Sequence, residues 1–247
     1  MRFYFLLLSI LFSQFSHSQN ARLNTISYDT ILPDHRLKAK DLVVPGILTG
    51  YGFWALNSKE IKRINQRAKR KISPGKYYYK TSVDDFLQYT PAVAVYGLNA
   101  FGIKGENNFR DRTGIYIMAT IITCSFITPL KGISKEERPD GSACNSFPSG
   151  HTATAFAAAE FLRQEYKTKS PWYGILGYAV ATTTGILRVY NNRHWVSDIV
   201  AGAGIGIIST KISYWAYPEI KKLLFKDKPR RLTAEDLKNL NENNLPY

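Results

Sequence analysis

Cysteine is scarce in this sequence, and the few thiols are not spaced for a structural role. The 247 residues include two cysteines, Cys124 in an apolar segment and Cys144 in a polar loop. Disulfide-stapled domains and cysteine zinc sites need more cysteines at closer spacing, so neither class fits. We expect two unpaired thiols.

Acidic residues are also few. The chain has 19 Asp and Glu against 33 Lys and Arg, which gives a formal net charge of +14. Such an excess favours an anionic partner, either nucleic acid, a membrane surface or a phosphorylated substrate. The sequence contains no DNA- or RNA-binding motif, and its basic residues lie mostly just outside apolar segments. The pattern therefore favours a membrane surface and no nucleic acid.

The first residues have the pattern of an export signal. Arg2 precedes an apolar run at Phe3–Phe12, and the small residues Ser16 and Ser18 come just before Gln19. We predict a signal peptide at 1–18, with an uncleaved anchor as the alternative. Either one implies export or insertion into a membrane.

Residues 19–85 form an N-terminal extension. Within it, Leu42–Asn57 is apolar, but it is short and interrupted by Pro45. This segment could span the membrane, re-enter it or lie at its surface. The next stretch, KEIKRINQRAKRK at 59–71, is amphipathic and strongly basic. It predicts either a solvated helix face or a contact with lipid headgroups.

Clearer membrane segments follow the extension. Four of them are long, and a fifth, shorter one is rich in Ala and Thr. The run GAGIG at 202–206 lacks the spacing of a nucleotide-binding loop, and its small residues allow helices to approach closely. The sequence thus predicts an all-α integral-membrane bundle of about five to six helices, with a core at 86–217 and a basic, polar tail at 218–247. The four clearer segments and the short one are Phe86–Ile103, Thr113–Leu130, Trp172–Leu187, Trp195–Tyr217 and His151–Leu162.

Unusual polar residues lie where these segments begin or end. Successive helices alternate in direction, so the end of one, the start of the next, the end of the third and the start of the fourth share one membrane face. That face is predicted to gather Lys131, Arg138, Ser149, His151, Arg188, His194 and Asp198.

The residue types at this face favour a phosphate site. Singly, each cation would be an ordinary flanking residue, but three that converge need an anion, and phosphate accepts forked arginine bonds. The Pro-Ser-Gly turn before His151 would be an ordinary N-cap, or a site where free N–H groups bind an anion. Asp198 follows His194 by one helical turn and can orient its imidazole.

Three motifs resemble a known family. Lys131-x6-Arg138-Pro139, Pro148-Ser149-Gly150-His151 and Arg188-x5-His194-x3-Asp198 are similar to the signature motifs of the type 2 phosphatidic acid phosphatases. That superfamily includes class A acid phosphatases, glucose-6-phosphatase and vanadium haloperoxidases. The resemblance covers roughly 86–217, and it departs from the family at Leu187, where many members have serine.

The resemblance implies a mechanism. His194 would be the nucleophile that forms a phosphohistidine, Asp198 would orient it, and His151 would protonate the leaving group. Lys131, Arg138, Arg188, Ser149 and Gly150 would hold the phosphoryl group. No metal and no other cofactor is implied.

The resemblance also leaves the substrate open. It implies a hydrolase that acts on a phosphorylated lipid such as phosphatidic acid, phosphatidylglycerol phosphate, undecaprenyl diphosphate or lipid A. A lipid phosphotransferase with the same phosphohistidine, a vanadium-dependent peroxidase and an inactive membrane scaffold are the alternatives. The oligomeric state is not indicated.

The membrane side of the site follows from charge. The basic tail and the loops 104–112 and 163–171 would be cytoplasmic by the positive-inside rule. We therefore expect a bacterial inner-membrane protein whose active site faces the periplasm. If the signal is cleaved and Leu42–Asn57 does span, the helix count places the site in the cytoplasm instead.

Overall fold

The computed structural model describes residues 37–73 and 81–225, and within these ranges the chain forms eight helices and no strand. The predicted signal peptide at 1–18 and most of the tail at 218–247 lie outside the described residues. The prediction of an all-α fold is confirmed. In chain order the helices are α2 (Ala39–Asn57), α3 (Lys59–Ile72), α4 (Val83–Leu87), α5 (Thr90–Ala100), α6 (Phe109–Ser134), α7 (Gly150–Tyr166), α8 (Pro171–Tyr190) and α9 (Val196–Phe225).

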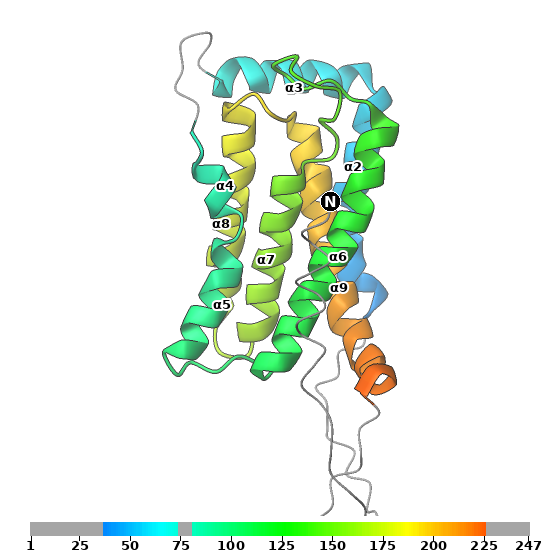
Figure 1. Cartoon of the computed structure of the whole chain (residues 1–247). Coiled ribbons are helices and arrows are strands. Elements are labelled where there is room, and N and C mark those ends of the chain that lie inside the picture. The colour runs from blue at the N-terminus through cyan, green and yellow to red at the C-terminus, as the bar shows by residue number, and fades with distance from the viewer. Residues whose placement is uncertain (1–36, 74–80, 226–247) are drawn as a thin grey trace, which may run out of the picture. The chain divides into compact units, whose positions relative to one another are not determined.

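The longer helices run side by side as a bundle, and α3 lies across one end of it (Figure 1). The segment predicted as a single helix at Phe86–Ile103 is divided between α4 and α5. Pro91 sits in the first turn of α5, where its missing N–H costs nothing and its ring favours the start of a new helix.

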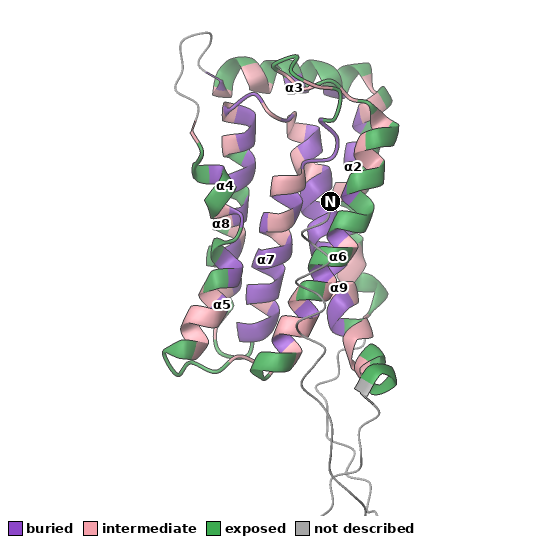
Figure 2. Cartoon of the chain, viewed as in Figure 1, coloured by how far each residue is buried: buried purple, intermediate pink, exposed green. Residues whose placement is uncertain are grey.

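The core of the bundle is formed by α7 and α9. Both are largely buried, whereas α2, α5 and α6 expose one side (Figure 2). Small residues allow this packing: a Cβ on Gly202 would lie 2.6 Å from the Ser149 carbonyl oxygen, and one on Gly206 would lie 2.9 Å from the Ala157 nitrogen. Between them, Gly204 faces α2, where a Cβ would lie 2.5 Å from the Pro45 carbonyl oxygen. The glycines of 202–206 do serve close helix approach, as predicted.

The expectation that Pro45 breaks its segment is wrong. Helix α2 continues through Pro45 for 19 residues, which corresponds to ~28 Å at 1.5 Å per residue. Pro45 is buried, its carbonyl oxygen faces Gly204 of α9, and the Thr49 hydroxyl donates to that oxygen at 2.9 Å. Contacts with α9 therefore hold a helix that sequence alone marks as interrupted.

Two of the described helices are long and apolar enough to cross a membrane. They are Phe109–Ser134 and Val196–Leu224, which contain 18-residue windows with mean hydropathies of 1.6 and 1.3. The first exposes large apolar side chains along its outer side, including Ile117, Ile121 and Phe126. Apolar side chains are similarly exposed on α2, α5 and α8, as expected of helices that face lipid.

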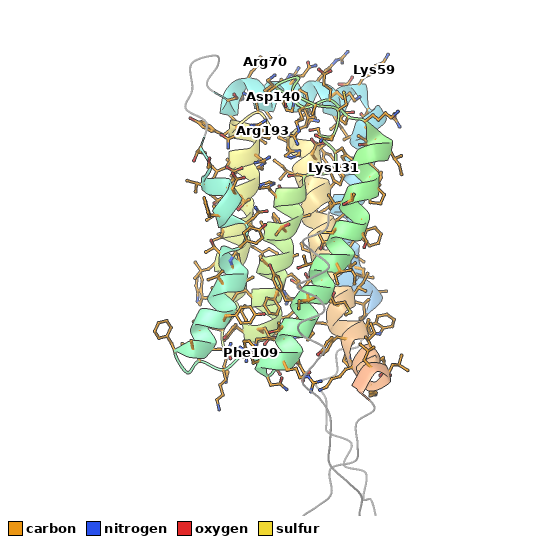
Figure 3. All side chains as sticks on the ribbon, in the orientation of Figure 1. Lys59, Arg70, Phe109, Lys131, Asp140 and Arg193 are labelled. Atoms are coloured by element: carbon orange, nitrogen blue, oxygen red, sulfur yellow. The ribbon has the colours of Figure 1, made fainter. Side chains whose placement is uncertain are left out.

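Helix α3 marks the end of the bundle where the site lies. The predicted amphipathic helix is present, with Ile61 and Asn65 buried and its basic residues mostly exposed. Asn65 forms a reciprocal pair with Ser197 at the start of α9: its amide donates to Oγ at 2.7 Å, and its Oδ1 accepts the Ser197 N–H at 3.2 Å. Figure 3 shows Lys59 and Arg70 of α3 at the same end as Lys131, Asp140 and Arg193.

Candidate functional site

His194 and Asp198 form a buried pair where the chain enters α9. Their side chains are 2% and 1% exposed, and His194 Nδ1 lies 3.6 Å from Asp198 Oδ2. That carboxylate oxygen also accepts the Ser146 hydroxyl at 2.5 Å and the Trp195 N–H at 2.9 Å. The carboxylate is thus fixed by two donors and faces Nδ1, which leaves Nε2 as the ring nitrogen free for chemistry.

Burial determines the charge of His194. Removal from water lowers the pKa of its imidazole to about 4, although the neighbouring Asp198 carboxylate opposes the shift. At neutral pH the ring is therefore uncharged, and it has a lone pair available for attack.

The start of α7 is tied to the start of α9. Ser149 is the N-cap of α7: its hydroxyl oxygen accepts the Thr152 N–H at 3.4 Å, and its own N–H donates to the Asp198 carbonyl oxygen at 3.0 Å. The Ser149 N–H is thus already engaged, and its side chain serves the helix start. Gly150 adjoins Lys131, since a Cβ there would lie 4.0 Å from Lys131 Cε.

Asn145 organises the two cations of the first motif. Its carbonyl oxygen accepts Lys131 Nζ at 2.7 Å, and its Oδ1 accepts Arg138 Nε at 2.8 Å. The next residue is Ser146, which bonds to Asp198. The loop between α6 and α7 therefore connects the cations to the histidine–carboxylate pair.

The last cation, Arg188, is buried at the end of α8 and paired with α4. Its Nη1 lies 2.5 Å from Asp84 Oδ2 and 3.7 Å from Asp85 Oδ1, while its Nε has no hydrogen-bond partner within the described residues. His151 Nε2 lies 2.8 Å from Asp85 Oδ1. Asp84 is also fixed by the Asn191 side-chain amide, which donates to Oδ1 at 3.0 Å.

The structure brings all eight predicted residues to one end of the bundle. It also adds four that the motifs do not contain: Asp84, Asp85, Asn145 and Ser146. The two aspartates come from the expected extension at 19–85, so contacts of the site cross the expected boundary at 86. The sequence did contain an indication of their role, because Asp84 and Asp85 are adjacent acids that directly precede an apolar segment in a chain with few acidic residues.

One group of side chains has the composition of a metal site. Donor atoms of Asp84, Asp85 and His151 lie within 4.8 Å of one another. Spacing did not reveal them, since 66 residues separate Asp85 from His151. Arg188 already neutralises Asp84, and its positive charge opposes a second cation there. The prediction that the reaction needs no metal stays a prediction.

A pocket of about 460 Å³ opens beside His151. It lies between α6, the first turns of α7 and the junction of α4 with α5. Its lining combines apolar and polar groups. The lining residues are Asp85, Gln88, Tyr89, Thr123, Cys124, Ile127, Thr128, Gly150, His151 and Thr154.

Comparison with known proteins gives consistent matches. The family model of the PAP2 superfamily matches residues 113–222. A lipid A 1-phosphatase of Porphyromonas gingivalis is 39% identical over 169 residues, which cover 66% of this chain and 36% of that protein. A lipid A 4′-phosphatase of Helicobacter pylori is 32% identical over 132 residues, which cover 45% of this chain and 65% of that protein. The chain thus spans about a third to just under two thirds of these relatives' lengths.

One solved structure supports the fold. The first transmembrane PAP2 type phosphatidylglycerolphosphate phosphatase from Bacillus subtilis superposes with a TM-score of 0.51 and 18% identity, over 75% of this chain and 99% of that one. The described helices therefore share the fold of that transmembrane protein.

Proposed function

Because the family model of the PAP2 superfamily matches residues 113–222, we propose that the chain is a membrane phosphatase that hydrolyses a lipid phosphate monoester or diphosphate. The observation that carries the proposal is the buried His194–Asp198 pair, beside which His151 and three cations are gathered at one end of a membrane bundle. A neutral imidazole, a proton donor and an anion cradle are the parts that metal-free phosphoryl transfer requires.

The first step is attack by His194. Nδ1 faces Asp198, so Nε2 forms the new bond to phosphorus while the bond to the leaving oxygen breaks. His151 gives a proton to that oxygen, and the lipid alcohol departs. Asp198 stabilises the positive charge that develops on the ring of His194.

The second step releases phosphate. Water attacks the phosphohistidine, and His151, now neutral, accepts the water's proton. The bond between Nε2 and phosphorus breaks, which restores the neutral His194 and frees inorganic phosphate. Lys131, Arg138 and Arg188 hold the phosphoryl oxygens throughout, and the Gly150 N–H contributes at the start of α7.

We propose a lipid A-type phosphate as the leading substrate. Two relatives, at 39% and 32% identity, are named lipid A phosphatases. The pocket beside His151 adds polar groups from Gln88, Thr123, Thr128 and Thr154, which suit a sugar more than a bare acyl chain.

For location, we propose a bacterial inner membrane with the site facing the periplasm. The basic loops 104–112 and 163–171 lie at the bundle end away from the site, which supports the proposal. The continuous α2 and the basic α3 at the site end argue for the opposite orientation, so the orientation needs its own experiment.

Phosphate release tests the proposed function. Detergent-purified protein with EDTA is given phosphatidic acid, phosphatidylglycerol phosphate, undecaprenyl diphosphate and a lipid A fraction, beside His194→Ala and the surface control Glu60→Gln. We expect release that survives EDTA, persists in the control and falls by at least ~10³-fold in His194→Ala, because the nucleophile is lost.

The outcomes separate the alternatives. Release that is unchanged in His194→Ala would mean that another group is the nucleophile. A labelled phosphohistidine without release would point to a phosphotransferase that lacks its acceptor. If no lipid gives either a labelled phosphohistidine or released phosphate, the inactive membrane scaffold is the remaining alternative.

A further inference from the structure

Helix α4 brings two aspartates to two groups of the proposed site. Asp84 is 1% exposed and pairs with Arg188, and Asp85 is about half exposed and contacts His151. The helix has only five residues, and it packs against α7 and α8. Neither aspartate belongs to the three motifs, and the matched family region begins only at residue 113.

Besides Asp85, the charged groups that act on His151 include Arg188 and Asp84. Arg188 approaches it from α8, and Lys131 adjoins Gly150 from α6. Arg188 disfavours a positive charge on the imidazole, and Asp84, which would favour one, is occupied by Arg188 and Asn191. Among these neighbours, Asp85 is the one that holds His151 directly, at 2.8 Å from Nε2.

A hydrogen bond to Nε2 also fixes the ring. With Nε2–H directed at Asp85, Nδ1 is the nitrogen whose proton remains for the leaving oxygen. The carboxylate stabilises the charged, protonated ring before the reaction and orients it afterwards, when the ring must accept a proton from water.

We propose that Asp85 is a positioning residue that orients His151 and stabilises its protonated form as the general acid, which makes α4 part of the active site. The proposal rests on the proposed phosphatase function. Asp84 has the companion role: it anchors Arg188 through Nη1 and leaves Nε, which has no partner within the described residues, for a phosphoryl oxygen.

The experiment is a pH profile of kcat/KM for Asp85→Asn, with Asp85→Glu as the conservative variant and Glu60→Gln as the surface control. The lipid phosphate preferred by the wild type is the substrate. We expect at least a ~10-fold loss at pH 7 for Asp85→Asn, a part of what a general acid contributes. The alkaline limb of the Asp85→Asn profile moves to lower pH, because the protonated His151 ring loses its carboxylate partner. Asp85→Glu restores the limb.

A second readout uses p-nitrophenyl phosphate, whose leaving group departs with little help from an acid. The loss in Asp85→Asn shrinks on this ester, as it does in His151→Ala, whereas His194→Ala is inactive on both substrates. A thermal unfolding curve in detergent confirms that Asp85→Asn folds.

The failures are distinguishable. Wild-type protein without His194-dependent release overturns the proposed function itself. Active wild type with an unmoved alkaline limb in Asp85→Asn overturns the role of Asp85 and leaves only a structural contact. Faster turnover in Asp85→Asn overturns it too, since the carboxylate would then be a competitor of the substrate phosphate.

Discussion

At the residue scale, the environment of His194 decides how the proposed enzyme responds to acid. An imidazole that takes part as a nucleophile must be neutral, and an ordinary histidine loses this form below a pKa of 6.5. Here burial lowers the pKa to about 4, and the fixed Asp198 carboxylate counters burial only in part. The low pKa therefore belongs to the fold rather than to the residue type.

The same shift sets the sign of a stability effect. Between pH 6.5 and about 4 the unfolded chain binds a proton on this residue that the folded chain does not bind. His194 therefore destabilises the fold progressively as pH falls through this window. Above pH 6.5 the imidazole is neutral in both states and contributes no pH dependence.

We predict that the acid limb of kcat/KM falls near pH 4 to 5 rather than near 6.5. The measurement is a rate profile from pH 3.5 to 8 on a lipid phosphate, after correction for the substrate's own ionisation, which is titrated separately. A limb centred at 6.5 would mean that water reaches the ring of His194 in solution.

At the element scale, the glycines of α9 decide how closely the central helices approach. Gly202 and Gly206 face α7, and Gly204 faces α2. The backbone of α7 carries Ser149 and His151, while α9 carries Asp198. The packing distance between these two helices therefore sets the distances within the site.

We predict that Gly206→Ala destabilises the bundle by about 1–3 kcal/mol, because the new methyl group meets backbone atoms of Ala153 and Ala157 that cannot move aside as a side chain would. Thermal unfolding in detergent measures the effect. Gly46→Ala on α2 is the matched control, since nothing lies within 4 Å of a Cβ there. Equal midpoints for the two variants would contradict close packing at Gly206.

Several elements could be read from the sequence because their causes are local. The motifs lie at segment ends, and alternating helix direction is enough to bring those ends together. The spacing of the glycines at 202–206 likewise predicted that helices approach closely there. Pro45 could not be read correctly, because the continuity of α2 depends on α9, a partner about 160 residues later. Asp84 and Asp85 were missed for the same reason: their partners on α7 and α8 are distant in the chain.

At the scale of the whole molecule, the bundle has two unlike ends. One holds the site and is crossed by the basic helix α3, and the other holds the loops between α5 and α6 and between α7 and α8 (Figure 1). Both ends carry lysines and arginines, so the charge distribution does not decide which end faces the cytoplasm. An experiment that measures the accessibility of a residue at each end decides it directly.

We predict that Cys144, which is exposed in the loop between α6 and α7, reacts with a membrane-impermeant thiol reagent applied to cells with a permeabilised outer membrane. Cys124 is first replaced by serine. The matched control is Lys169→Cys in a chain without Cys144, at the opposite end of the bundle, which should remain unlabelled until the inner membrane is opened. The reverse pattern would place the site in the cytoplasm.

Helices α2 and α9 are antiparallel, since Gly52 adjoins Ser197 and Ala201 while Pro45 adjoins Gly204. Ala39, where α2 begins, and Phe225, where α9 ends, therefore lie at the same end of the bundle, away from the site (Figure 1). Probes attached to the first turn of α2 and to the last turn of α9 would therefore report on the same end of the bundle, the one opposite the proposed chemistry.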